Sequence, residues 1–114
     1  MEVTPILLAD RQANDNRSMG KLSGPELNKA VASLKGWTVV KGKLHKEYKF
    51  ADFIHAFGFM ATAALAIEKM EHHPEWFNVY NRVTVDLTTH DAKGITSKDI
   101  DLAKLLDETA KKLQ

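Results

Sequence analysis

The fold is decided by residues 52–71, DFIHAFGFMATAALAIEKME, which carry the longest apolar run in the chain. Apolar side chains recur there at helical spacing in three stripes, so the sequence predicts one helix that is apolar nearly all round. The stripes are Phe53, Phe57, Met60, Ala64 and Ile67; Phe59, Ala63, Ala66 and Met70; and Ile54, Ala61 and Leu65. We expect this helix to pack on a sheet with one side and on another subunit with the other. The alternative is a helix at the centre of a single domain, with no subunit contact.

Two strands are expected before this helix, at residues 37–40 and 43–50. Lys41-Gly42 between them can form a two-residue turn, which places Val39 opposite Leu44. Apolar side chains then alternate along the second strand, so one face of the pair should be buried.

Two further strands are expected after the helix, at residues 76–80 and 83–89. A three-residue loop between them would place Val79 opposite Val83 and turn the odd-numbered side chains of both strands to the core. These side chains are Phe77, Val79, Val83, Val85 and Leu87.

A helix is expected at each end of this core. Ser23 and Glu26 have capping-box spacing, and Gly36 is a suitable stop for the first helix. The last helix should start near residues 96–97, with Asp99 in its first turn. The resulting order predicts an α+β fold, a four-stranded antiparallel sheet with three helices packed on one face.

The length of 114 residues and the ordinary composition predict one domain, residues 22–114, preceded by a polar, flexible tail, residues 1–21. The net charge of +1 gives no electrostatic footprint for nucleic acid. The absence of cysteine excludes disulfides, thiolate metal sites and a cysteine nucleophile. The apolar run at residues 56–67 is shorter than a membrane span. We expect a soluble, cytoplasmic protein.

Three of the five histidines come close together in this fold. His72 and His73 follow the long helix, and His90 ends the last strand. Glu68 lies on the helix face of His72 if the helix reaches that far, and Asp99 begins the last helix. Histidine exchanges protons near neutral pH, so several in one cleft can divide the proton transfers of an elimination or dehydration.

Other interpretations fit single members of this group. Adjacent histidines after a helix are often surface polar residues, and three histidines also allow a zinc site. Neighbouring side chains such as His72 and His73 diverge, however, and no zinc-protease motif accompanies them. Glu68 and His72 could form a simple helix-surface pair, and Trp76 and Tyr80 could serve only in sheet packing. No nucleophile elbow or glycine-rich phosphate loop is present in the sequence.

A family resemblance rests on residues 72–81, HHPEWFNVYN, read together with Glu68, His90 and Asp99. An acidic residue, three positions, His-His-Pro, then an aromatic residue, a histidine and an aspartate form the pattern of the pterin-4a-carbinolamine dehydratases. Tyr80 fills the aromatic position here. The chain resembles that family over residues 22–113, which leaves only the N-terminal tail unexplained.

The resemblance implies dehydration of 4a-hydroxytetrahydropterin, the product of aromatic amino-acid hydroxylases, to quinonoid dihydropterin and water. It implies neither a metal nor an organic cofactor. By position, His72 and His90 would be the acid–base pair, while His73 would mainly bind the pterin. The site residues implied are His72, His73 and His90 as catalytic groups, and Glu68, His73, Pro74, Trp76 and Asp99 as substrate-binding groups.

The resemblance also bears on partners. It implies homodimers joined through sheet edges, or homotetramers joined through the long helix, which agrees with the apolar helix at residues 52–71. An aromatic amino-acid hydroxylase would be the functional partner, and no direct contact with nucleic acid or membrane is expected. The alternatives are a dimerisation module of transcriptional-coactivator type and a dehydratase that serves another pterin pathway.

Overall fold

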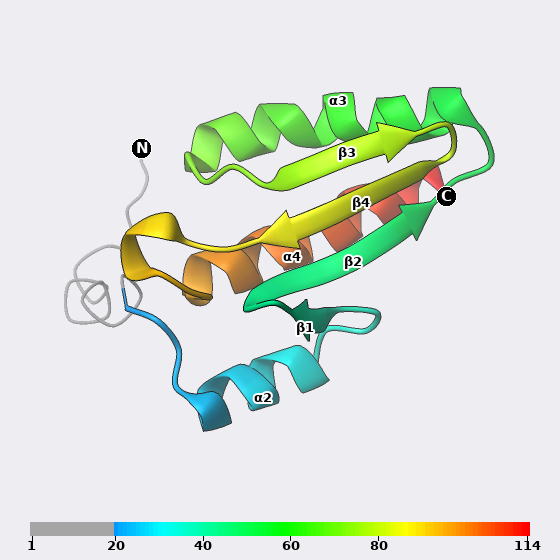
Figure 1. Cartoon of the computed structure of the whole chain (residues 1–114). Coiled ribbons are helices and arrows are strands. Elements are labelled where there is room, and N and C mark those ends of the chain that lie inside the picture. The colour runs from blue at the N-terminus through cyan, green and yellow to red at the C-terminus, as the bar shows by residue number, and fades with distance from the viewer. Residues whose placement is uncertain (1–19) are drawn as a thin grey trace.

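The computed structural model describes residues 20–114 and contains one four-stranded antiparallel sheet in the order β1-β2-β4-β3 (Figure 1). The predicted α+β order is confirmed, while the predicted tail falls almost wholly outside the described residues. The elements are α2 (Gly24–Ala32), β1 (Thr38–Val40), β2 (Lys43–Lys49), α3 (Phe53–Met70), β3 (Glu75–Val79), β4 (Arg82–Leu87), a 3-10 turn η1 (His90–Ala92) and α4 (Ser97–Leu113).

Helices α3 and α4 lie side by side on one face of the sheet, and α2 lies beside β1 at its edge (Figure 1). The core between the layers contains Phe59 of α3, Leu44 of β2 and Leu106 of α4, all fully buried. Leu27 and Val31 of α2 pack against the same core with partly buried side chains. All three helices thus contribute to one core, as a single small domain requires.

Helix α3 presents two different faces. Its buried face consists of Ala56, Phe59, Ala63 and Ile67. The opposite face exposes large apolar side chains, among them Ile54 and Leu65, with 76% and 78% of their surface accessible. By length and composition α3 is the one helix among residues 20–114 that could span a membrane, a test that the core helices of soluble proteins also pass. Its second apolar face has no partner within the described part of the chain.

The hairpin between β1 and β2 has the predicted register. Val39 pairs with Leu44, and both turn residues have positive φ, 51° at Lys41 and 78° at Gly42. Two such residues give a turn whose twist matches that of the strands, and glycine adopts this conformation without steric cost.

The predicted register between β3 and β4 is wrong by one residue. Val79 pairs with Arg82 instead of Val83, because the connection is a two-residue turn with Tyr80 at φ 51°. The shift turns Trp76 to the core face, opposite Val85, and leaves Phe77 58% exposed.

Two features account for this register. Asn81 exchanges hydrogen bonds with Phe50, through its backbone carbonyl at 2.8 Å and its side-chain amide at 3.1 Å, so the turn is held at the end of β2. The larger indole of Trp76 then packs edge-on against Phe59, with ring centroids 6.3 Å apart. The inward side chains of β4, Val83, Val85 and Leu87, are buried as predicted.

The predicted capping box of α2 is present, and α4 begins with a second one that was not predicted. Ser23 and Glu26 begin α2, and Thr96 and Asp99 begin α4. Helix α2 ends at Ala32, before the predicted stop at Gly36, because Ser33 caps it and the chain then turns towards β1.

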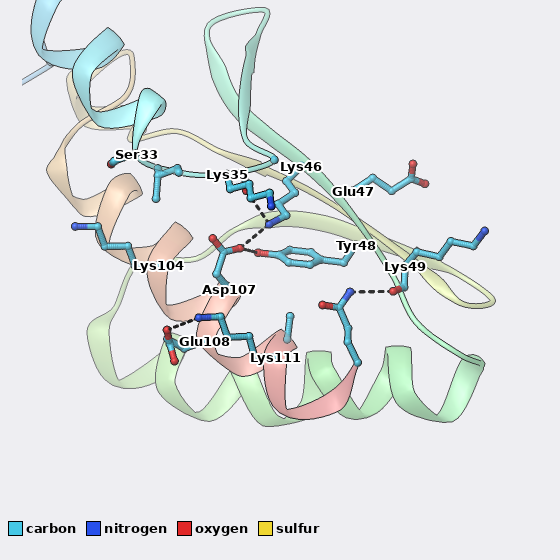
Figure 2. Close-up of a pocket in the computed structure, with 14 residues that line it drawn as sticks. Ser33, Lys35, Lys46, Glu47, Tyr48, Lys49, Lys104, Asp107, Glu108 and Lys111 are labelled. Atoms are coloured by element: carbon cyan, nitrogen blue, oxygen red, sulfur yellow. Dashed lines mark hydrogen bonds and ion pairs between the residues drawn. The ribbon is translucent and has the colours of Figure 1, made fainter.

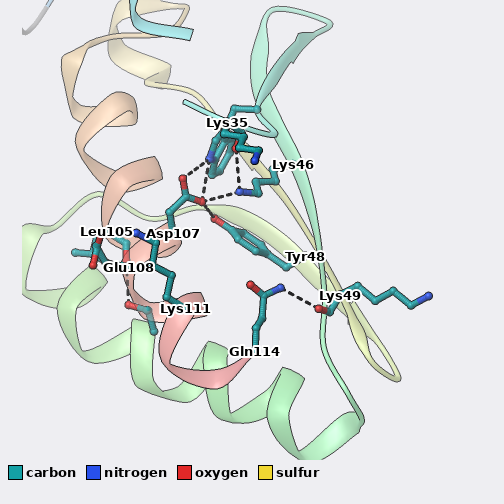
Figure 3. Close-up of polar contacts among 11 residues, drawn as sticks. Lys35, Lys46, Tyr48, Lys49, Leu105, Asp107, Glu108, Lys111 and Gln114 are labelled. Carbon is teal, nitrogen blue, oxygen red and sulfur yellow. Dashed lines mark hydrogen bonds and ion pairs between the residues drawn. The ribbon is translucent and has the colours of Figure 1, made fainter. Parts of the chain in front are cut away.

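Asp107 of α4 joins the helix to the first hairpin. Its carboxylate accepts hydrogen bonds from Lys46 Nζ at 2.8 Å and Tyr48 Oη at 2.5 Å (Figures 2 and 3). It also accepts one from Trp37 Nε1 at 3.1 Å. Burial, followed by the bond to Asp107, raises the pKa of Tyr48, so the phenol stays a neutral donor. This Asp107 cluster forms one wall of a surface cleft of about 670 Å³.

Replacement of this carboxylate should destabilise the fold. In Asp107→Ala, three partly buried donors lose their acceptor, and we expect the free energy of unfolding to fall by about 2 kcal/mol, the scale of hydrogen bonds to a charged group. Urea denaturation measures the change. Glu108→Ala is the matched control, because the contact that Glu108 makes within residues 20–114 is an exposed ion pair with Lys111. Equal stability of the two variants would contradict a structural role for the cluster.

Candidate active site

His72 stands where α3 ends. Glu71 adopts the left-handed conformation at φ 53° and terminates the helix, so His72 leaves the helix axis and reaches α4. Its Nε2 lies 2.6 Å from Asp99 Oδ1, and the two side chains are 12% and 0% exposed. Glu68 is therefore not the partner of His72. The two would share one helix face only if α3 continued to residue 72.

Asp99 has no contact with solvent, and each of its two oxygens has a hydrogen-bond partner. Oδ2 accepts from the Thr89 hydroxyl and from the Thr96 backbone N–H, each at 2.9 Å, while Oδ1 faces His72. A carboxylate carries only hydrogen-bond acceptors, so Oδ1 accepts the bond from His72 as Oδ2 accepts those from Thr89 and Thr96. His72 is then the donor through Nε2–H, which leaves Nδ1 as the ring nitrogen that can accept a proton.

His90 begins the 3-10 turn η1 and is 80% exposed. Its Nε2 lies 3.5 Å from Glu75 Oε2 on the edge strand β3. The other oxygen of Glu75 accepts a 2.6 Å bond from Lys43, and this hydrogen bond raises the pKa of the lysine. Glu75 thus places a carboxylate between two cationic or protonatable groups.

His73 pairs with Glu68 instead of His72. The distance from His73 Nε2 to Glu68 Oε1 is 3.0 Å, and both side chains are largely exposed. The exposed environment of this pair contrasts with the buried pair of His72 and Asp99.

All three histidines line one cleft of about 320 Å³. Thr88, Thr89 and Lys98 complete much of its wall. Asp99 contacts His72 and Glu68 contacts His73, but neither acidic residue lines the cleft itself. Pro74 and Trp76 are also not among its lining residues.

Three residues of this region escaped the sequence analysis. Thr89 contacts Asp99, Glu75 contacts His90, and Lys98 lines the cleft. The capping box of Thr96 and Asp99 could have indicated Lys98, which lies between them in the same turn. Thr89 and Glu75 gave no signal, because their partners are distant in sequence. No group of three or more histidine or acidic side chains within residues 20–114 is arranged to hold a metal ion.

Comparison with known proteins places this cleft in a family context. The profile of the family described as "Pterin 4 alpha carbinolamine dehydratase" matches residues 20–109. The chain belongs to this family.

Relatives of the pterin-4-alpha-carbinolamine dehydratase family align over most of their length. A protein of Solibacter usitatus, provisionally named a pterin-4-alpha-carbinolamine dehydratase, is 68% identical over 90 residues, 79% of this chain and 95% of the relative. One of Rhizobium rhizogenes with the same name is 53% identical over 92 residues, 79% and 91% of the two chains. A crystal structure of a transcriptional coactivator/pterin dehydratase from Brucella melitensis superposes with a TM-score of 0.77 at 48% identity, and the match covers 80% and 99% of the two chains.

The tautomer of His72 is open to test by Asp99→Asn. An asparagine that keeps its carbonyl towards Thr89 and Thr96 presents its NH₂ group to His72, which should then accept at Nε2 and carry its proton at Nδ1. Long-range ¹⁵N–¹H spectra of labelled histidine distinguish the two tautomers. Glu68→Gln is the control, because it alters only the exposed partner of His73. A proton at Nε2 of His72 in both variants would contradict the assignment.

Proposed function

We propose that the protein is a hydro-lyase that converts 4a-hydroxytetrahydropterin to quinonoid dihydropterin and water by histidine acid–base catalysis. The observation that carries this proposal is the buried pair of His72 and Asp99, which opens on the same cleft as His90. In the reaction a ring nitrogen loses its proton, the C4a–O bond breaks, and the hydroxyl leaves as water after gaining a proton. No electrons are exchanged with a second reactant, so proton transfer alone suffices and we propose no cofactor.

The environments of the histidines support different roles. His72 donates to Asp99 through Nε2–H, so its Nδ1 is suited to take the proton from the ring nitrogen. His90 lies 3.5 Å from Glu75, whose negative charge balances an imidazolium, so His90 is suited to protonate the leaving hydroxyl. His73, oriented by Glu68, would bind the pterin. Pro74 and Trp76 would shape the pocket indirectly, through the strand that follows His73.

The biological setting is part of the same proposal. Aromatic amino-acid hydroxylases release the 4a-hydroxytetrahydropterin that this reaction consumes, so the protein would act in the cytoplasm to recycle their cofactor. A dehydratase in another pterin pathway would use the same acid–base groups on a different pterin side chain. Comparison of pterins with different side chains as substrates separates these two settings.

Loss of either proposed acid–base histidine should abolish most of the catalysis. His72→Ala and His90→Ala each remove a proton-transfer group, and we expect kcat to fall by about 10²–10⁴-fold. The measurement is the rate at which 4a-hydroxytetrahydropterin decays. His45→Ala is the control, because His45 pairs with Asp86 away from the cleft. Full activity in both site variants would refute the proposal.

We also propose that the exposed apolar face of α3 joins subunits into a homodimer or homotetramer. This face includes Phe53, Ile54, Phe57 and Leu65, each about half exposed or more. Exposed apolar patches of this kind mark protein–protein interaction sites. A coactivator-type module is the second candidate function, since the Brucella melitensis neighbour carries that title and the same face could receive a foreign helix.

A charge on this face should reduce the oligomer size. Leu65→Lys places an ammonium group in the proposed interface, and we expect light scattering after gel filtration to report a smaller assembly than that of the unaltered protein. Lys112→Glu, at the exposed end of α4, is the charge-altering control. An unchanged mass of the Leu65→Lys protein would exclude this face as the self-association surface.

A further inference from the structure

Thr89 is a buried residue that links two of the histidines. It follows β4 and directly precedes His90, and only 9% of its surface is exposed. Its hydroxyl lies 2.9 Å from Asp99 Oδ2 and 2.8 Å from the hydroxyl of Thr96. A threonine has no charge and exchanges no proton near neutral pH, so its effect on proton transfer would act through the groups that it positions.

The direction of these hydrogen bonds follows from the groups at the two ends of the chain, the backbone N–H of Lys98 and the carboxylate of Asp99. Thr96 Oγ1 accepts from the backbone N–H of Lys98 at 3.2 Å, and Asp99 Oδ2 can only accept when ionised. Thr89 must then give its single proton to Asp99, and Thr96 gives its proton to Thr89. The two hydroxyls form a one-way chain that starts at the N-terminus of α4 and ends on the carboxylate that His72 contacts.

The backbone of Thr89 holds the other histidine. Thr89 and Gly94 form an isolated antiparallel bridge, with N–H···O distances of 2.9 Å and 3.3 Å. The carbonyl of Thr89 also accepts from the N–H of Ala92 at 3.1 Å, which closes the turn that carries His90. His90 itself is exposed, so its placement depends on this backbone anchor more than on packing of its ring.

We propose that Thr89 is a positioning residue that sets His72 and His90 relative to each other. The link consists of a 2.6 Å bond from His72 to Asp99, a 2.9 Å bond from Asp99 to Thr89, and the peptide bond from Thr89 to His90. The inference rests on the proposed dehydratase function. In this proposal the spacing between the base and the acid is set by Thr89, a residue outside the family's histidine pattern.

The proposed reaction depends on the spacing between the two histidines. The base and the acid act on adjacent atoms of one pterin, so an error in their spacing affects both proton transfers at once. Displacements of about 1 Å in catalytic groups can cost roughly 10²-fold in rate. Thr89→Val keeps the shape of the side chain and removes only the hydroxyl, whereas Thr89→Ser keeps the hydroxyl.

The experiment measures kcat, KM and the ¹⁵N-histidine spectra of both Thr89 variants. We expect Thr89→Val to lower kcat by about 10- to 100-fold with KM unchanged, and to shift the ring signals of both His72 and His90. Thr89→Ser should restore kcat and the signals. Thr109→Val is the matched control, because in the described part of the chain that hydroxyl donates to the carbonyl of Leu105 within α4, away from the cleft. Thr89→Ala replaces Thr89→Val if the valine protein does not fold.

Each other outcome has a defined meaning. Equal kcat in the Thr89→Val and unaltered proteins, or a Thr89→Ser protein as slow as Thr89→Val, would overturn the proposal. A slower Thr89→Val enzyme with unchanged histidine signals would also overturn it. If the unaltered protein does not dehydrate the pterin, the proposed function fails, and the shift of the histidine signals alone decides whether Thr89 positions them.

Discussion

The buried carboxylate of Asp99 is the interaction on which the arrangement depends. A charge without solvent contact is costly unless donors surround it, and here the donors come from three parts of the chain. Thr96 contributes the start of α4, Thr89 the end of the sheet, and His72 the end of α3. One helix-capping residue thereby ties the helical layer to the sheet. Asp107, two turns along α4, makes a second such connection to the first hairpin.

The sequence predicts the fold well where local rules act alone. The capping box of Ser23 depends on residues three positions apart, and the turn at Lys41-Gly42 depends on two residues with positive φ. The predicted register of β3 was wrong, because the alternation of Phe77 and Val79 suggested that these two side chains face the core. That choice is made by a distant contact, the anchoring of the turn to Phe50, and no local pattern records it.

The candidate site shows the same division. The three histidines could be singled out from the sequence, and the structure brings them to one cleft. The partners of the histidines could not be predicted, because Glu71 ends α3 in a left-handed conformation. As a result Glu68 pairs with His73, and Asp99 pairs with His72. Helical spacing predicts neighbours only as far as the helix continues. The roles of the individual side chains depend on these partners more than on the histidine pattern itself.

The sheet order has a consequence for how the chain folds. The central strands, β2 and β4, are joined by pairs such as Leu44 with Leu87 and Lys49 with Arg82, while α3 and β3 lie between them in sequence. Each outer hairpin is local and can form quickly, but closing the long loop between them carries an entropic cost and slows folding. His72 and His90 flank the β3–β4 hairpin, so this local element brings them to the same end of the sheet. Asp99 lies on α4, so the buried pair with His72 forms only when that last helix packs beside α3.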